Sequence, residues 1–168
     1  LDEVGAHPAR HVVVTGGEPM IAPGIIALTE RLRERNLHIT IETAGTVFEP
    51  VACDLMSISP KLANSTPDDA RFSKPHERLR IQPATLARLM TRYAYQLKFV
   101  IAAPGDLEEV RALVDSLQAD RERVILMPEG IDPALLRQRA LWLAEICKEE
   151  GFRFSPRLHV DLWGDRRG

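Results

Sequence analysis

Cysteine is scarce in this chain, which contains Cys53 and Cys147 and no other cysteine among its 168 residues. The two lie far apart in the sequence, so the close cysteine spacing that holds an iron–sulfur cluster or a zinc ion is missing. A disulfide scaffold of the small secreted type is excluded as well. We therefore expect no metal ligands in this chain, and we interpret both thiols as small, buried side chains.

Strong net charge and long apolar runs are absent too. The 22 lysine and arginine residues nearly balance the 24 acidic residues, which gives no electrostatic reason to expect nucleic acid or a membrane surface as a partner. No apolar run approaches the roughly 20 residues that cross a bilayer, and no secretion leader is visible. The five histidines have no metal-binding spacing, and no P-loop or GxSxG motif supplies a catalytic side chain. The sequence favours a cytoplasmic protein.

Short apolar strands alternate with segments of helical periodicity, a pattern typical of a mostly parallel sheet with helices packed outside it. A complete eight-stranded barrel takes about 250 residues. We therefore expect an α/β fold of the partial (β/α) barrel type that forms one domain over residues 1–168. Strands are expected at residues 11–15, 37–43, 55–59, 97–101 and 124–127. Helices are expected to begin at or near Pro23, Pro83, Asp106 and Pro133.

Residues 64–80 are polar and contain two prolines. Structureless loops longer than about 12 to 15 residues are uncommon inside compact domains and are often functional. We expect an irregular loop here that either covers the active site or is a variable insertion. Further along, Asp106 and Glu109 have the spacing of a helix capping box, and residues 157–161 are expected to place polar groups in a last strand.

Gly16, Gly17, Glu18 and Pro19 directly follow the first expected strand. A strand that ends in two glycines exposes bare backbone at its carboxyl edge, where parallel-sheet proteins bind their ligands. Its terminal carbonyls can approach the ammonium of a bound amino acid, and Glu18 can help to neutralise that charge. The alternative interpretation is an ordinary glycine-containing turn between a strand and a helix.

Polar residues end the next two strands as well. Residues 42–46 (ETAGT) place a carboxylate and hydroxyls before a glycine, and Ser59, Pro60 and Lys61 place a hydroxyl and an ammonium on a stiffened strand end. Such groups can bind the ribose and carboxylate of a nucleoside amino acid. The alternatives are that the threonines satisfy nearby backbone groups and that Lys61 is a solvated surface charge.

Gln96 and Lys98 alternate with Leu97 and Phe99, so the two polar side chains share one face of the expected strand. They point into the barrel if the strand is central. An exposed edge strand would give the same pattern, and the sequence leaves this open.

Six segments in order carry a resemblance to a known family: residues 13–19 (VVTGGEP), 41–46 (IETAGT), 57–62 (SISPKL), 96–99 (QLKF), 126–130 (LMPEG) and 157–164 (RLHVDLWG). The chain resembles the radical S-adenosylmethionine enzymes and, more narrowly, the 7-carboxy-7-deazaguanine synthases. The resemblance implies a partial barrel of six or fewer strands. Members of the family bind a 4Fe-4S cluster through three cysteines upstream of the Gly-Gly-Glu-Pro segment. Those cysteines are missing here, so we expect the chain to be the carboxyl-terminal portion of such an enzyme, without the first strand and the cluster loop.

The resemblance implies a lyase that converts 6-carboxy-5,6,7,8-tetrahydropterin to 7-carboxy-7-deazaguanine with loss of ammonia, a step of queuosine and 7-deazapurine biosynthesis. It implies S-adenosylmethionine, a 4Fe-4S cluster and Mg2+ as cofactors, and flavodoxin or ferredoxin as electron donor. Homodimers are common in the family. The alternatives are a radical activating enzyme and a non-catalytic remnant that binds S-adenosylmethionine.

Site residues also follow from the resemblance. For S-adenosylmethionine it implies contacts from Gly16, Gly17, Glu18, Glu42, Ser59, Pro60 and Lys61. It implies that Thr15 binds the substrate and that the terminal carboxylate of Gly168 accepts hydrogen bonds from the pterin ring. The alternative for Gly168 is a frayed tail, which is the usual state of a chain terminus.

Overall fold

A computed structural model describes residues 2–164 of the chain. These residues form two compact units, which are described separately below. The first comprises residues up to Ser59 together with Gln82–Gln96, and the second comprises Pro60–Ile81 and the residues from Leu97 onward. That the two units together make the single partial-barrel domain expected from the sequence stays a prediction.

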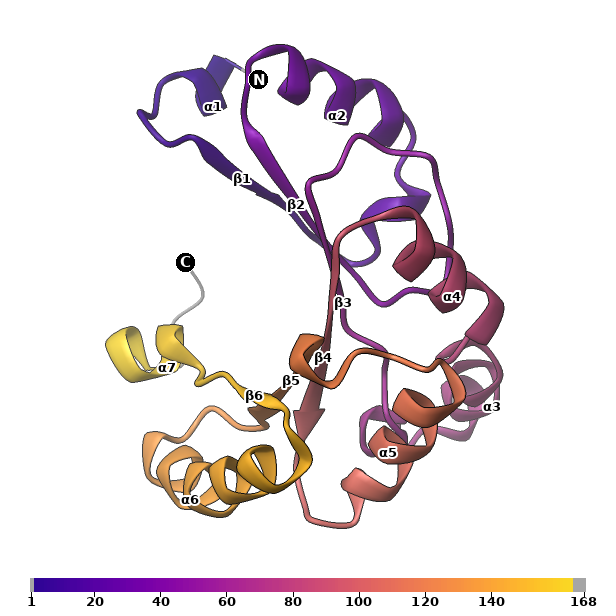
Figure 1. Ribbon diagram of the computed structural model, residues 1–168, viewed down its shortest axis with the longest axis vertical. Coiled ribbons are helices and arrows are strands. Elements are labelled where there is room, and N and C mark those ends of the chain that lie inside the picture. The colour runs from indigo at the N-terminus through magenta and orange to yellow at the C-terminus, as the bar shows by residue number, and fades with distance from the viewer. Residues whose placement is uncertain (1, 165–168) are drawn as a thin grey trace. The chain divides into compact units, whose positions relative to one another are not determined.

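The first unit is built on three parallel strands. Its elements are α1 (Asp2–Gly5), β1 (His11–Val14), the 3-10 turn η1 (Pro19–Ile21), α2 (Ile25–Glu34), β2 (His38–Thr43), β3 (Leu55–Ile58) and α4 (Pro83–Arg92). Val14 pairs with Ile41, and Thr43 pairs with Ile58, so the three strands end close to one another. Helices α2 and α4 lie on the same side of these strands (Figure 1). The core comprises Met20, Leu32, Ile39, Ile41, Met56, Ile58, Leu86 and Leu89.

The second unit repeats the strand–helix alternation. Its elements are η2 (Ala63–Ser65), α3 (Ala70–Leu79), β4 (Tyr95–Ile101), α5 (Asp106–Ser116), η3 (Arg121–Arg123), β5 (Val124–Pro128), α6 (Pro133–Glu150), β6 (Arg153–Phe154) and α7 (Leu158–Trp163). Tyr95 and Gln96, the first two residues of β4, belong to the first unit. Parallel pairing joins β4 to β5 and β5 to β6. The core comprises Leu97, Phe99, Ile101, Val110, Leu126 and Leu143.

The strands follow the order β1-β2-β3-β4-β5-β6 in one parallel sheet. Strands β1 and β6 are the two ends of this order, so the sheet is not closed within residues 2–164. This confirms the expected α/β fold with a parallel, partial-barrel type of sheet and helices around it. Strand β4 has a neighbour on each side, which removes the edge-strand interpretation of Gln96 and Lys98.

The expected loop at residues 64–80 is wrong, because most of it is the helix α3. Asp69 caps this helix by accepting the backbone N–H of Arg71 at 2.9 Å, and Pro75 lies inside it. None of residues 71–79 is buried, and the apolar side chains of Phe72 and Leu79 are exposed, so no buried face marks this segment as a helix. Proline inside a helix removes one backbone hydrogen bond, which is why two prolines suggested a loop.

Two further expectations are wrong. Residues 158–163 form the helix α7 and not a strand, with Val160 buried while Leu158 and Leu162 are exposed. Asp106 and Glu109 do not form a capping box. The N-cap of α5 is Gly105, and no side-chain hydrogen bond caps this helix start. Asp106 instead accepts the N–H groups of Ala102 and Ala103 at 2.7 and 3.0 Å.

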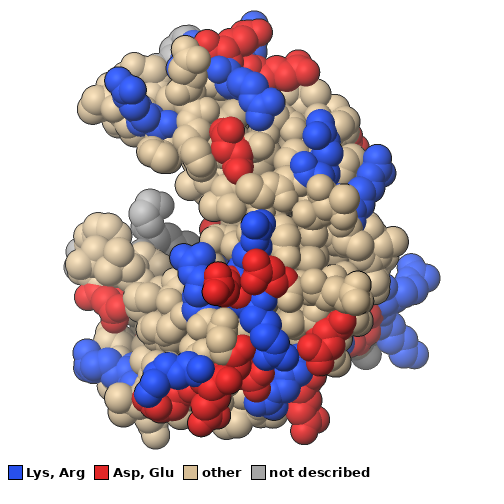
Figure 2. All heavy atoms as spheres, viewed as in Figure 1, with Lys and Arg blue, Asp and Glu red and all other residues tan. Residues whose placement is uncertain are grey.

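Charged side chains of both signs are interspersed on the face of the molecule that Figure 2 shows. No helix between residues 2 and 164 has both the length and the apolar character that a membrane crossing needs.

Candidate functional site at the strand ends

The end of β1 presents bare backbone. Thr15, Gly16 and Gly17 are all exposed, and Gly16 has a φ of 153°, a backbone conformation that residues with side chains rarely adopt. A Cβ atom on Gly17 would meet no other atom of the described residues within 4 Å. Packing within residues 2–164 therefore does not require glycine at position 17, and it leaves space there for a ligand.

Glu18 joins the end of β1 to the end of β2. One of its carboxylate oxygens accepts the backbone N–H of Met20 at 3.1 Å and the hydroxyl of Thr43 at 2.8 Å, and the other accepts the N–H of Ala44 at 2.9 Å. It is also the N-cap of η1, with Pro19 in the first position of that turn. The sequence predicted a ligand contact for Glu18 and missed this structural role, although a carboxylate directly before proline is a recognisable cap signal.

Thr43 extends the connection to β3. Its hydroxyl accepts the N–H of Gly45 at 2.9 Å, and its carbonyl accepts the N–H of Ser59 at 2.7 Å. Thr43 is 3% exposed, so these bonds are shielded from water. The ends of β1, β2 and β3 are therefore held together through Glu18, Thr43 and Ser59, which we call the strand-end junction.

Two further side-chain hydrogen bonds lie in the same unit. The hydroxyl of Thr15 donates to the carboxylate of Glu42 at 3.3 Å, and Gln96 donates to the hydroxyl of Ser57 at 3.0 Å. The structure thus brings six of the predicted site residues to one edge of the first unit: Thr15, Gly16, Gly17, Glu18, Glu42 and Ser59. Exposed backbone and two carboxylates at one edge suit a ligand that carries a cationic amino group.

The remaining predicted residues belong to the second unit or lie beyond the described chain. Pro60 is buried and Lys61 is exposed, and the carbonyl of Lys61 accepts a hydrogen bond from Arg80 at 3.0 Å. Gly168 lies outside the described residues. Arg157, which follows β6, has a buried Nε atom with no hydrogen-bond partner in the described part of the chain. Sequence reasoning had placed Arg157 in a motif but had assigned it no role.

The described residues do not fit an iron–sulfur cluster. Within residues 2–164 no three His, Cys, Asp or Glu side chains lie close enough together to hold a metal ion. Burial raises the pKa of Cys53 and of Cys147 to about 11 in each case, which disfavours the thiolate that a cluster requires. The sequence-based interpretation of the cysteines as small, buried thiols is confirmed for Cys147, whereas Cys53 is only half-buried.

Two pockets of the first unit are lined by other residues. One of about 580 Å³ lies between η1, the start of α2 and residues 47–49, and one of about 550 Å³ lies between Phe48, Pro50 and α4. Neither includes a predicted site residue. The strand-end site is an exposed edge and not one of these pockets.

Comparison with known proteins gives a consistent result. No family model matches the chain. The 7-carboxy-7-deazaguanine synthase of Halobacterium salinarum is 41% identical over 170 residues, covering 94% of this chain and 66% of that protein. The synthase of Rhodopirellula baltica is 40% identical over 172 residues, covering 100% of this chain and 67% of that protein. The chain therefore spans about two thirds of the length of these relatives.

The crystal structure of QueE from Escherichia coli has a similar fold. It superposes with a TM-score of 0.65 at 26% sequence identity, covering 92% of this chain and 60% of that chain. The unclosed parallel sheet and the polar residues at its strand ends define an α/β protein of the radical S-adenosylmethionine class. Within that class, the chain belongs to the 7-carboxy-7-deazaguanine synthase family. The family recognised from the sequence motifs is thereby confirmed.

Proposed function

We propose that this chain forms the part of a 7-carboxy-7-deazaguanine synthase that binds S-adenosylmethionine and the pterin substrate. The reaction is the conversion of 6-carboxy-5,6,7,8-tetrahydropterin to 7-carboxy-7-deazaguanine with loss of ammonia, in queuosine biosynthesis. The observation that carries the proposal is the strand-end junction. Glu18, Thr43 and Ser59 hold three strand ends together, and the predicted ligand residues gather there in a chain 40% identical to a named synthase.

The first unit would bind the amino acid part of S-adenosylmethionine. Gly16 and Gly17 are exposed, so their backbone carbonyls would accept hydrogen bonds from its ammonium, and the nearby carboxylates of Glu18 and Glu42 would offset the positive charge. Ser59, in the same unit, would supply a hydroxyl for the ribose. The family resemblance assigns to Lys61, in the second unit, the ammonium for the carboxylate. Bound S-adenosylmethionine supplies the radical chemistry of this class. The protein orients the reactants and excludes water from them.

The substrate carries a carboxylate, and the second unit has a donor for it. The Nε–H of Arg157 is buried and has no partner among residues 2–164, and a buried N–H left unpaired costs about 1 to 3 kcal/mol. A substrate carboxylate at this position would satisfy it through a charge-assisted hydrogen bond. The family resemblance adds Thr15 and the terminal carboxylate of Gly168 as substrate contacts.

The remaining parts of the proposal rest on the family alone. They are the 4Fe-4S cluster, Mg2+, flavodoxin or ferredoxin as electron donor, assembly into homodimers and a cytoplasmic location. Free thiols at Cys53 and Cys147 are compatible with a reducing compartment.

The direct test is turnover by the full-length gene product with its cluster reconstituted. Anaerobic incubation with a reductant, S-adenosylmethionine and 6-carboxy-5,6,7,8-tetrahydropterin should give 7-carboxy-7-deazaguanine and ammonia in equal amounts. A reconstituted protein that cleaves S-adenosylmethionine but forms no deazaguanine acid would remove the substrate assignment. A protein that binds S-adenosylmethionine without any turnover would support the remnant interpretation.

A further inference from the structure

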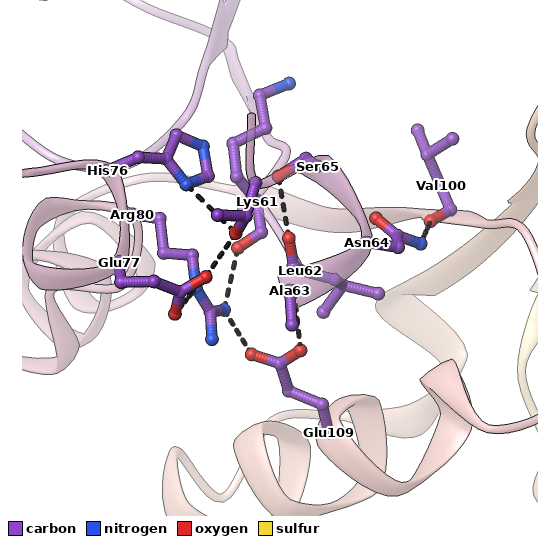
Figure 3. A network of polar contacts seen from close by, with 11 residues as sticks. Lys61, Leu62, Ala63, Asn64, Ser65, His76, Glu77, Arg80, Val100 and Glu109 are labelled. Atoms are coloured by element: carbon purple, nitrogen blue, oxygen red, sulfur yellow. Dashed lines mark hydrogen bonds and ion pairs between the residues drawn. The ribbon is translucent and has the colours of Figure 1, made fainter. Parts of the chain in front are cut away.

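Arg80 lies at the centre of a polar network in the second unit (Figure 3). Its side chain is 13% exposed and forms an ion pair with Glu109. Its Nε donates to the carboxylate of Glu77 at 2.8 Å, and its Nη1 donates to the backbone carbonyl of Lys61 at 3.0 Å. A guanidinium can serve two carboxylates and a carbonyl at once because its donors lie in a fixed, planar fork.

Glu109 contacts the same segment from the other side. While one of its oxygens pairs with Arg80, the other accepts the backbone N–H of Ala63 at 2.9 Å. The ion pair therefore holds the carbonyl of Lys61 and the N–H of Ala63 together. Leu62, between them, is 2% exposed and anchors the segment in the core. We call this arrangement of Arg80 and Glu109 the backbone clamp.

Other contacts fix the residues that follow. The amide of Asn64 donates to the carbonyl of Val100 at 3.1 Å and to Asp106 at 2.8 Å. The side chain of Lys61 is left out of this network, and Figure 3 shows it pointing away from Arg80 and Glu109. The backbone at Lys61 is thus held in place while its ammonium remains available.

We propose that Arg80 and Glu109 are positioning residues for S-adenosylmethionine binding, because they fix the backbone from which the side chain of Lys61 extends. The inference rests on the proposed function, since Lys61 has this importance only if it meets the cofactor. Arg80 and Glu109 themselves use their charged groups on each other and on the backbone, and they act on the ligand through Lys61.

The test is a double-mutant cycle measured by calorimetry on the full-length protein. Arg80→Gln and Lys61→Ala should each raise the Kd for S-adenosylmethionine by about tenfold. Because Arg80 acts through Lys61, the double variant should bind about as weakly as Lys61→Ala alone. If Arg80 matters only for general stability, the changes in Kd caused by Arg80→Gln and Lys61→Ala should multiply in the double variant. That result would overturn the inference.

Arg71→Gln is the matched control. Arg71 lies in α3, the helix whose C-cap is Arg80, its side chain is 81% exposed, and its ion pair is with Asp69. This variant should leave the Kd unchanged. If Arg80→Gln fails to fold, Glu109→Gln takes its place in the cycle, because its amide oxygen can still accept the N–H of Ala63 while the ion pair is lost.

Amide hydrogen exchange separates the inference from the proposed function. Without any ligand, Arg80→Gln should speed exchange at Ala63 by about tenfold or more, and Arg71→Gln should not. A wild-type protein that fails to bind S-adenosylmethionine would refute the proposed function even if the exchange result confirmed the clamp. Binding by the wild type, weakened by Lys61→Ala but unchanged by Arg80→Gln, would refute the positioning role alone.

Discussion

Glu18 and Thr43 are 25 residues apart in the sequence and share a hydrogen bond of 2.8 Å that joins the ends of β1 and β2. The hydroxyl of Thr43 also accepts the N–H of Gly45, so it both donates and accepts a hydrogen bond. In a site made of strand ends, such bonds decide where each exposed carbonyl lies. The carboxylate of Glu18 therefore shapes the site whether or not it touches the ligand.

Replacing Glu18 should destabilise the protein. Glu18→Ala leaves the hydroxyl of Thr43 and the N–H of Ala44, both part-buried, without their acceptor. We expect the free energy of unfolding to fall by about 2 to 3 kcal/mol in urea titrations. Glu18→Gln keeps an acceptor oxygen and should lose less. Equal stability of Glu18→Ala and the wild type would contradict the structural role.

Gly45 is expected to be the glycine that tolerates substitution least. Its φ is 76°, and a Cβ atom would lie 2.4 Å from Leu86 Cδ2 and 2.8 Å from Ile58 Cγ2. Gly45→Ala should lower the free energy of unfolding by about 2 to 4 kcal/mol, through backbone strain and overpacking of the core. Thermal or urea unfolding measures this change. A loss below about 0.5 kcal/mol, the size expected for a surface substitution, would contradict the packing at Gly45.

Both cysteines should resist alkylation in the folded protein. Burial raises the pKa of each to about 11, so the reactive thiolate is a small fraction of the thiol at pH 8. We expect slow reaction of Cys53 and Cys147 with a thiol reagent under native conditions and fast reaction of both in guanidinium. Rapid native labelling of two thiols would show that their environments differ from those described.

Acid should weaken the ion pairs that Glu150, at the end of α6, forms with Arg111 and Arg121. Hydrogen bonds from Arg121 and then Arg111 hold the pKa of Glu150 below its ordinary value of 4.5. The paired carboxylate therefore stabilises the fold above that value, and the contribution is lost as the pH falls through the lowered pKa. Glu150→Gln should cost about 1 kcal/mol at pH 7 in urea titrations. The difference from wild type should shrink below pH 4.5, and a constant difference down to pH 3 would disprove the assignment.

The sequence predicted strands β1 to β5 and the polar residues at their ends, because these strands carry apolar runs that stop at polar residues, but it missed the two-residue strand β6. Strand β2 and the edge at Glu42 are examples. The sequence-based prediction was wrong for two helices that bury few side chains. Helix α3 has no buried residue between 71 and 79, and α7 alternates apolar and polar residues like a strand although Val160 is its buried side chain.

Side-chain partners were the second kind of failure. Glu109 has the spacing of a cap but pairs with Arg80 and Ala63, which are far from it in the sequence. Glu18 was expected to face a ligand, and three of its acceptor positions serve the protein. Local patterns do not identify contacts between distant segments, because those contacts depend on how the strands and helices pack.

The central claim is that the exposed backbone at Gly16 and Gly17 binds S-adenosylmethionine, and calorimetry of Gly17→Val tests it most directly. A Cβ at position 17 meets no atom of residues 2–164 within 4 Å, so the free energy of unfolding of the variant should lie within about 0.5 kcal/mol of the wild-type value. Its Kd for S-adenosylmethionine should rise at least about tenfold, because the side chain takes the place of the ligand. An unchanged Kd in a variant of normal stability would contradict the account.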